Sequence, residues 1–403
     1  MSLNAERSYK MKLRDVENAF KYRRIPYPKR SVELIALLAI SCTFFLFMHT
    51  NKLNSRLKEM EVKLQPSEFS ALGLTGNHIS GHDAGKHDDI NTLHGTYQYL
   101  KSTGQLWRLN PKFLNNTKYH TRDILFFNRV PKTGSETLIE LMIRLGKKNE
   151  FQNERAPYSK QVGMYWSVER QKQEVARIMK LQSDLAFVYV EHMMYMNVRP
   201  FHYAQPIYIN MIRDPIERVI SWFYYKRTPW SSVKMFEVTG KFENRTHYVK
   251  NFEDCVLSHD FECRYDHGLS FSEDSADHKR QSLFFCGHSP VCEPFNSPAA
   301  IARAKQIVER DYSVVGSWED VNVTLSVFEN YIPRFFKGST ELYYEPIKGL
   351  AFQKANTNHW KPKISERIKR IMRANFTQEY DFYYFCKQRL YRQYFAINRH
   401  LHF

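Results

Sequence analysis

Three apolar runs in the middle of the chain have the length and composition of buried strands. They cover residues 123–130 (DILFFNRV), 185–190 (LAFVYV) and 206–212 (PIYINMI). The first leads through a short polar segment into 138–145, whose apolar residues recur at helical spacing. The third leads into a helical pattern at 216–223, with Pro215 at the first helical position. The pattern predicts two strand–loop–helix units and a further strand between them.

The longest uncharged stretch lies near the start of the chain, at residues 34–48 (LIALLAISCTFFLFM). With residues 31–33 it reaches about eighteen residues, close to the shortest helix that spans a bilayer. The first thirty residues carry nine Lys and Arg against three acidic residues, and such a flank predicts a cytoplasmic N-terminus. We therefore expect a cytoplasmic tail at 1–30, a transmembrane signal-anchor at 31–49, and a type II topology with a luminal remainder. A cleaved signal peptide and a buried core helix are the alternative interpretations.

The segment from 50 to 121 has the composition of a luminal stem. Four apolar residues recur at heptad-like spacing: Leu53, Leu57, Met60 and Leu64. This spacing is compatible with a short coiled coil or with a solvated helix. Residues 72–105 are rich in Gly, His, Asp, Ser and Thr, which is typical of a flexible linker. The irregular spacing of the histidines favours a polar linker over a metal site, so we expect the folded domain at 122–403.

Composition and charge narrow the possible partners. Of the 403 residues, 43% are hydrophobic and 15% are aromatic, so most of the chain is expected to fold. The mean hydropathy of −0.55 excludes a polytopic membrane protein. The formal net charge is +17; the first thirty residues carry +6 of it, which leaves +11 for the rest. Such a charge favours a polyanionic partner, namely nucleic acid, an anionic membrane face or an acidic polysaccharide.

Cysteines and glycosylation sequons agree with a luminal domain. Four cysteines form two pairs, at separations of eight and six residues: Cys255 with Cys263, and Cys286 with Cys292. In an oxidising compartment each pair would form a disulfide. A zinc site is the alternative, although neither pair has CxxC spacing. Four asparagines begin N-x-T sequons, which are glycosylated only in the secretory lumen: Asn115, Asn244, Asn322 and Asn375.

The polar segment after the first strand has the composition of an anion-binding loop. Residues 131–137 read PKTGSET. Lys132 supplies a positive charge, three hydroxyl side chains are possible donors, and Gly134 lets the backbone approach a ligand. A helix that begins directly after such a loop points its free N–H groups at an anion. This is not a Walker A loop, in which the lysine follows the glycine; an ordinary strand-to-helix turn is the alternative.

The ends of the other two predicted strands carry further candidates. Arg213 follows the strand at 206–212, and Ser221 lies two helical turns later, so the pair could hold a second phosphate. Pairing of Arg213 with Asp214 or Glu217 is the structural alternative. His192 follows the strand at 185–190, and a lone histidine at a strand end is usually structural.

These segments resemble the nucleotide-binding motifs of a known enzyme family. Residues 127–135 (FNRVPKTGS) are similar to the 5′-phosphosulfate loop of sulfotransferases that use 3′-phosphoadenosine 5′-phosphosulfate (PAPS). Residues 212–218 (IRDPIER) with Ser221 are similar to their 3′-phosphate motif. Three further stretches resemble the heparan sulfate and uronyl 2-O-sulfotransferases: residues 286–292, 333–343 and 379–383. Within that group the chain is most similar to the insect Pipe-type sulfotransferases, over about residues 122–390.

The resemblance implies a role for each candidate. It places Lys132 at the 5′-phosphate, where lysine also acts in catalysis by stabilising the leaving group, and assigns the 3′-phosphate to Arg213 and Ser221. It identifies His192 as the catalytic base that takes the proton of the acceptor hydroxyl, and Arg129 as a substrate contact. The other donor-binding residues it implies are Thr133, Gly134, Ser135 and Thr137. No metal is implied, because lysine and backbone donors replace Mg²⁺.

The sequence departs from the family pattern at two single residues and in one short segment. Val190 replaces a second histidine, as in the uronyl enzymes, and this weakens the assignment to heparan sulfate. Residues 228–233 (TPWSSV) stand where the family has a basic stretch that binds polysaccharide. Glu136 occupies a position where hydroxyl or small residues are common. We therefore expect an acceptor that is less anionic or differently shaped.

Together these patterns predict one α/β luminal domain with a P-loop-like PAPS sulfotransferase fold, in which helices flank a central, mainly parallel sheet. The expected activity is sulfuryl transfer in the Golgi from PAPS to a glycan hydroxyl. The resemblance implies the 2-OH of a uronic acid in a glycosaminoglycan or related glycan, and a homotrimer on the Golgi membrane. A Golgi sulfotransferase acting on protein tyrosine and an inactive, polyanion-binding, lectin-like membrane protein are the alternatives. Nucleic acid becomes the least favoured partner.

Overall fold

The computed structural model describes residues 48, 90–155, 166–181, 185–270, 279–345 and 361–398. The chain divides into two units, Met1–Gln65 and Pro66–Phe403, and the elements of the fold belong to the second. Within these described ranges, no helix has both the length and the apolar composition needed to cross a membrane. The predicted tail, the heptads and all but Met48 of the predicted signal-anchor lie outside the described residues.

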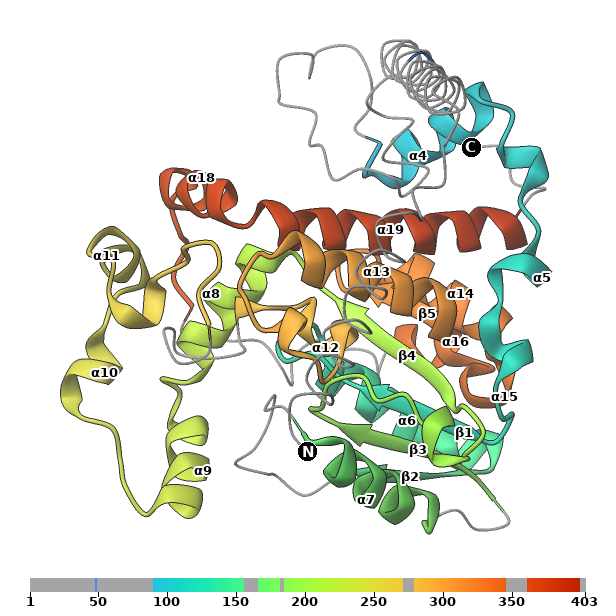
Figure 1. Cartoon of the computed structure of the whole chain (residues 1–403), viewed down its shortest axis with the longest axis horizontal. Helices are drawn as coiled ribbons and strands as arrows, with labels where there is room; N and C mark the ends of the chain where they lie inside the picture. The colour runs from blue at the N-terminus through green and yellow to red at the C-terminus, as the bar shows by residue number, and fades with distance from the viewer. Residues whose placement is uncertain are drawn as a thin grey trace, which may run out of the picture. The chain divides into compact units, whose positions relative to one another are not determined.

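A sheet of five parallel strands forms the centre of the domain (Figure 1). The strands are β1 (Ile124–Asn128), β2 (Phe151–Arg155), β3 (Ala186–Glu191), β4 (Ile207–Ile212) and β5 (Tyr312–Ser317). Their order across the sheet is β2-β3-β1-β4-β5. β1, β3 and β4 confirm the three strands predicted from the apolar runs. Because these three lie side by side and run parallel, their carboxyl ends meet at one edge, where α/β sheets bind ligands.

The strands contribute alternate residues to two hydrophobic cores, one on each face of the sheet. In β1, Ile124 and Phe126 belong to the first core, and Leu125 and Phe127 to the second. The first core includes α7 (Val168–Met179), α8 (Pro215–Tyr225), α12 (Leu283–Cys286) and α13 (Pro298–Asp311). The second includes α6 (Ser135–Asn149), α14 (Val321–Tyr331) and α15 (Pro333–Phe336). Strands covered on both faces read as continuous apolar runs.

Helices α6 and α8 confirm the two helices predicted after the first and third strands, and Pro215 is the first residue of α8. The longest described helix, α19 (Thr377–Ile397), runs beside α13 and α14 (Figure 1). The other described elements that follow β1 are η3 (Arg199–Phe201), α9 (Pro229–Thr239), α10 (Arg245–Val249), α11 (Phe252–Leu257), η4 (Phe261–Cys263), η6 (Pro290–Cys292), α16 (Ser339–Tyr344) and α18 (Glu366–Asn375).

Part of the predicted stem belongs to the folded domain. Four elements precede the predicted start of the domain: α4 (Leu93–Ser102), η1 (Leu106–Arg108), α5 (Pro111–Leu114) and η2 (Asn116–Tyr119). Tyr97 and Leu100 of α4 are 5% and 2% exposed, and the Tyr97 ring lies 5.6 Å from that of Phe395 on α19. The predicted boundary at residue 122 is therefore too late, because α4 buries its apolar residues against a helix from the other end of the chain.

Both cysteine pairs form disulfides. Cys255–Cys263 joins α11 to η4, and Cys286–Cys292 joins α12 to η6. Sulfur atoms bonded to each other are not thiolate ligands, so the zinc interpretation is wrong. Cys386 on α19 is a buried free cysteine.

The four sequon asparagines lie at the starts or ends of helices. Asn244 and Asn322 are exposed, whereas Asn115 and Asn375 are half-buried. Asn115 caps η2 by accepting a hydrogen bond from the Thr117 amide (2.9 Å). The two exposed asparagines are therefore the most accessible to glycosylation.

Candidate active site

The loop between β1 and α6 is held in shape by its own backbone and by β4. The Thr133 hydroxyl donates to the Val130 carbonyl (2.9 Å), and the Val130 amide donates to Oδ1 of Asn210 on β4 (3.3 Å). Gly134 has left-handed backbone, with a φ of 79°. A Cβ atom on Gly134 would lie 1.9 Å from Cε3 of Trp318. Glycine is required here because any other residue would be strained and would collide with the indole ring.

Helix α6 begins directly after this loop, at Ser135. Among the residues that the structure describes, no side chain caps its first turn, because the capping position is Gly134. The amides at such a helix start, together with the helix dipole, form a binding site for an anion. Ser135 and Thr137 lie in this turn and are 4% and 3% exposed. The hydroxyl proton of Thr133 is used within the loop, so it is not available to a ligand while that hydrogen bond is kept.

Lys132 supplies the positive charge beside the start of α6. Its Nζ lies 3.9 Å from the centre of the Tyr225 ring on α8, which is a cation–π contact. Burial and the nearby charge of Arg213 lower the pKa of Lys132 to about 8. An anion bound beside this lysine would favour its charged form.

Arg213 connects the two predicted phosphate-binding segments. Its Nη1 donates to the Lys132 carbonyl (3.2 Å), and its amide donates to Oε1 of Gln281 (2.9 Å). In the described part of the chain Arg213 forms no ion pair with Asp214 or Glu217. Asp214 instead caps α8 by accepting from the first two free amides (3.0 and 2.9 Å), and Glu217 pairs with lysines near the C-terminus. The alternative interpretation, in which Arg213 pairs with Asp214 or Glu217, is therefore wrong.

Ser221 lies two turns into α8 and is 6% exposed. Among the contacts of the described residues there is none between Ser221 and Arg213. Arg213 lies two residues before α8, whose first turn is capped by Asp214, and Ser221 lies within that helix.

His192 immediately follows β3, and its imidazole contacts the residue that follows β1. Its Nδ1 lies 3.0 Å from the backbone carbonyl of Arg129. Because a carbonyl only accepts hydrogen bonds, Nδ1 carries the proton and Nε2 keeps its lone pair. Burial and the positive charge of Arg129 lower the pKa of His192 to about 3. The imidazole is therefore neutral, in the form that a general base requires.

Arg129 is fixed at both its backbone and its side chain. Its amide donates to the Glu191 carbonyl (2.9 Å), next to His192. Its guanidinium pairs with Glu136 on α6, and Glu136 also accepts from Nη2 of Arg155 on β2 (2.8 Å). These side chains bring a second group of charges to the carboxyl edge of the sheet, beside His192.

Several residues of this site were missed by the sequence analysis. Asn128 and Asn210 are 1% and 0% exposed near the ends of β1 and β4, and Nδ2 of Asn210 donates to the Asn128 carbonyl (2.7 Å). A polar residue inside an apolar strand was the available signal for both. Tyr225 and Trp318 carry no comparable signal, because they reach the loop from elements that are distant in the chain.

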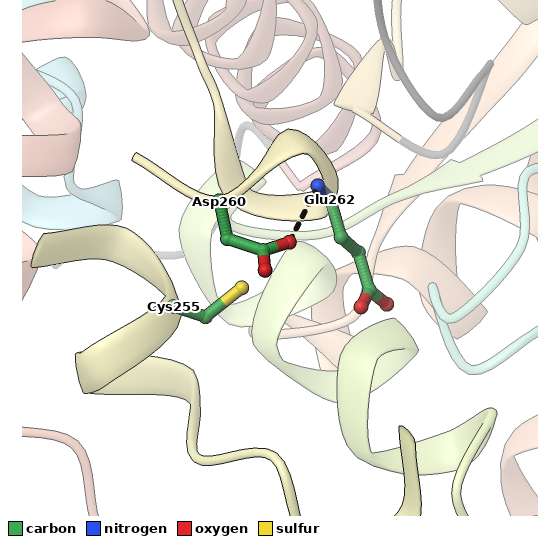
Figure 2. A group of neighbouring side chains, drawn as sticks. All are labelled: Cys255, Asp260 and Glu262. Carbon is green, nitrogen blue, oxygen red and sulfur yellow. Dashed lines mark hydrogen bonds between the residues drawn. The ribbon is translucent and has the colours of Figure 1, made fainter. Parts of the chain in front are cut away.

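Figure 2 shows Cys255, Asp260 and Glu262, whose potential ligand atoms all lie within 4.8 Å of one another. The Cys255 sulfur is in a disulfide, so it is not a free thiolate. Asp260 pairs with Lys250 (2.8 Å), whose hydrogen bond lowers the pKa of the carboxyl group, and Glu262 pairs with Arg227 (2.7 Å). This group is an ion-pair cluster next to a disulfide, and it supports no metal assignment.

Comparisons of the sequence with known proteins show which proteins this chain is similar to. A model of the sulfotransferase family matches residues 115–385, a range that contains the whole site from Arg129 to Trp318. The uronyl 2-sulfotransferase homolog pip of Drosophila melanogaster is 46% identical over 99% of this chain and 95% of its own length. Heparan sulfate 2-O-sulfotransferase 1 of Homo sapiens is 28% identical over 65% of this chain and 69% of its own. The heparin sulfate O-sulfotransferase of Drosophila melanogaster is 28% identical over 65% and 70%, respectively.

Proposed function

This chain belongs to the sulfotransferase family and is an O-sulfotransferase; from this premise we propose that it moves a sulfuryl group from PAPS to the 2-OH of a uronic acid in a glycosaminoglycan or related glycan. The observation that supports the proposal is the meeting of three candidate groups at one sheet edge. The Arg213 guanidinium contacts the Lys132 carbonyl (3.2 Å), and His192 contacts the Arg129 carbonyl (3.0 Å). Because only two residues separate Arg129 from Lys132, the base lies beside the donor loop.

The donor side of the site fits a nucleotide with two separate phosphates. PAPS supplies an activated sulfuryl group on its 5′-phosphate and carries a second phosphate at the 3′ position. Lys132 and the uncapped first turn of α6, with Gly134, Ser135 and Thr137, would bind the phosphosulfate. Arg213 would bind the 3′-phosphate, together with Ser221 on α8, the helix that begins two residues after Arg213. Because Gly134 has no side chain, the Trp318 indole packs directly against the backbone of this loop.

The acceptor side depends on His192. Its Nε2 accepts the proton of the attacking hydroxyl while an S–O bond forms to the acceptor oxygen and the S–O bond to the 5′-phosphate breaks. The charge that appears on the phosphate is stabilised by Lys132. The Arg129 carbonyl keeps the imidazole in the required tautomer, and the Arg129 guanidinium would face the bound acceptor.

The test is transfer of radiolabelled sulfate from PAPS to desulfated heparin, dermatan, chondroitin and endogenous glycoproteins. We expect label in a glycan with the wild type, and a loss of kcat of about 10²–10⁴-fold for His192→Ala, because general-base catalysis contributes that much. Lys132→Ala is expected to lose activity as well, whereas Arg144→Ala is the control, because Arg144 is a half-buried residue of α6 that pairs with Glu140. Label in protein tyrosine would favour the other acceptor class. Heparin binding that survives both active-site changes, without transfer by the wild type, would favour the lectin-like protein.

We also propose that the domain lies in the Golgi lumen, as part of a single-pass type II membrane protein that assembles as a homotrimer. The basic first thirty residues before an uncharged segment support the topology, as do the two disulfides. The trimer is supported by the family resemblance alone. Glycans at Asn244 or Asn322, detected as endoglycosidase-sensitive mass, are the expected sign of a luminal domain; their absence from protein made in animal cells would contradict it. Sedimentation of the full chain in detergent tests the trimer.

A further inference from the structure

Glu136 is paired with two arginines beside the proposed base. Its Oε1 accepts from Nη1 of Arg129 and from Nη2 of Arg155, the latter at 2.8 Å. The Arg129 side chain is 8% exposed, whereas those of Glu136 and Arg155 are 44% and 48% exposed. Burial alone would raise the pKa of Glu136, but the charges and hydrogen bonds of the two arginines outweigh burial and lower it. The carboxyl group is therefore ionised and cancels one of the two positive charges.

Arg129 lies where an acceptor has to bind. Its own carbonyl holds Nδ1 of His192 (3.0 Å), so its side chain extends from the residue that orients the base. Its Nε is buried and has no hydrogen-bond partner among the described residues. A buried donor without a partner is costly, and a ligand anion that reached Arg129 would remove that cost. The Glu136 carboxylate occupies the neighbouring Nη1 of the same guanidinium.

The basic residues that follow α8 are neutralised in a similar way. Lys226 and Arg227 come directly after Tyr225, whose ring contacts Lys132. Both pair with Glu262, at 3.5 and 2.7 Å, and the Arg227 side chain is 4% exposed. Both cations are therefore engaged in ion pairs within the protein, and Arg129 is the acceptor-side cation that Glu136 controls.

We propose that Glu136 determines the acceptor specificity of this enzyme by competing with acceptor anions for Arg129, an inference that rests on the proposed function. A densely sulfated glycan gains its contact to Arg129 only by displacing the Glu136 carboxylate. A sparsely sulfated glycan binds without a sulfate contact to Arg129, so the Glu136 carboxylate does not weaken its binding. An internal competitor of this kind discriminates against one class of substrate without adding a contact to the other. The acceptor is therefore a glycan with few sulfate groups near the accepting hydroxyl.

The test compares Glu136→Gln with Glu140→Gln at saturating PAPS. Glu140 lies one turn later on α6, is 48% exposed and pairs with Arg144 (2.9 Å), so its replacement removes the same charge elsewhere on the helix. KM is measured for 2-O-desulfated heparin and for unsulfated heparosan. We expect Glu136→Gln to lower the KM for desulfated heparin by about three- to tenfold, as one charge-assisted contact allows. The KM for heparosan, and both KM values of Glu140→Gln, should stay unchanged.

Three results would overturn the proposal: an equal shift in KM for both acceptors, the same shift from Glu140→Gln, or no shift from Glu136→Gln. A readout without catalysis separates this inference from the proposed function. Glu136→Gln should elute from immobilised heparin at higher salt than Glu140→Gln, even if the wild type transfers no sulfate. In an Arg129→Ala background, adding Glu136→Gln should change the elution salt concentration by no more than Glu140→Gln does. If the elution of this double variant still shifts by the full amount, the effect acts through Arg155 and the role of Arg129 is rejected.

Discussion

Lys132 and His192 acquire their chemical states from residues that lie far from them in the chain. Arg213, 81 residues after Lys132, donates to its carbonyl, and burial together with the Arg213 charge lowers the pKa of Lys132 to about 8. Arg129, 63 residues before His192, accepts from its Nδ1. The sequence identifies Lys132 and His192 as candidates, but the protonation states of their side chains depend on these contacts.

Gly134→Ala tests whether the donor loop depends on the close approach of Trp318. Gly104 is the matched control, because it also has positive φ (68° against 79°) but a Cβ there would meet nothing within 4 Å. We expect Gly104→Ala to lower the free energy of unfolding by about 1 kcal/mol, the cost of a left-handed alanine. Gly134→Ala should cost about 2–4 kcal/mol, because overpacking adds to that strain, and should weaken PAPS binding. Urea denaturation and PAPS titration measure the two effects; equal costs would show that the indole simply moves aside.

At the scale of elements, β1 and β4 are joined at the ends where the site lies. Nδ2 of Asn210 donates to the Asn128 carbonyl (2.7 Å), and its Oδ1 accepts from the Val130 amide (3.3 Å). The Tyr312 hydroxyl of β5 donates to Oδ1 of Asn128 (2.8 Å). This buried network ties three strands together directly below the donor loop, and it stabilises the loop through the Val130 amide.

Asn210→Ala is expected to leave the Val130 amide and the Asn128 carbonyl without their partner. Unsatisfied buried groups cost about 1–3 kcal/mol, so the free energy of unfolding should fall by that amount and the KM for PAPS should rise. Asn330→Ala is the control, since Asn330 is exposed and, in the part of the chain that the structure describes, donates only to the Ser326 carbonyl within α14 (2.9 Å). Chemical denaturation and steady-state kinetics measure both variants. An unchanged KM for PAPS in Asn210→Ala would show that the loop does not depend on this network.

The elements that escaped prediction share a weak local signal. β2 lies at the edge of the sheet, and only Phe151 of its five residues is buried. β5 (YSVVGS) is fully buried but contains two serines and a glycine, so it does not read as an apolar run. α4 lies in a segment whose polar composition resembles a linker, yet Tyr97 and Leu100 are buried. In each case a distant partner stabilises the element, and propensity alone does not indicate it.

At the scale of the whole molecule, three histidines are kept neutral by the fold. The pKa of His120 is about 4, that of His192 about 3 and that of His288 about 4, in each case because burial and a nearby arginine disfavour the charged form. In the unfolded chain each would titrate near 6.5. The unfolded state therefore binds more protons below pH 6.5, and the free energy of unfolding must fall as the pH is lowered toward 4.

His120→Phe tests this linkage. Both ring nitrogens of His120 are buried without a hydrogen-bond partner among the described residues, so phenylalanine removes the titration without removing a known hydrogen bond. We expect the variant to recover up to about 2 kcal/mol of the stability that the wild type loses between pH 7 and pH 5. Urea midpoints at pH 7, 6 and 5 measure the difference. A pH dependence unchanged by the substitution would contradict the role assigned to His120.

The local features of this protein could be predicted from its amino-acid sequence: the central buried strands, the helices α6 and α8, the cysteine pairs, and the loop with Lys132 and Gly134. These are visible because each depends on residues within one short segment, whose apolar runs and helical spacing are read directly. The contacts between distant residues became known from the folded structure, including Arg213 with the Lys132 carbonyl, Glu136 with Arg129 and Trp318 against Gly134. These contacts depend on the strand order β2-β3-β1-β4-β5. That order brings separate parts of the chain to one edge of the sheet, and no local pattern records which of them will meet.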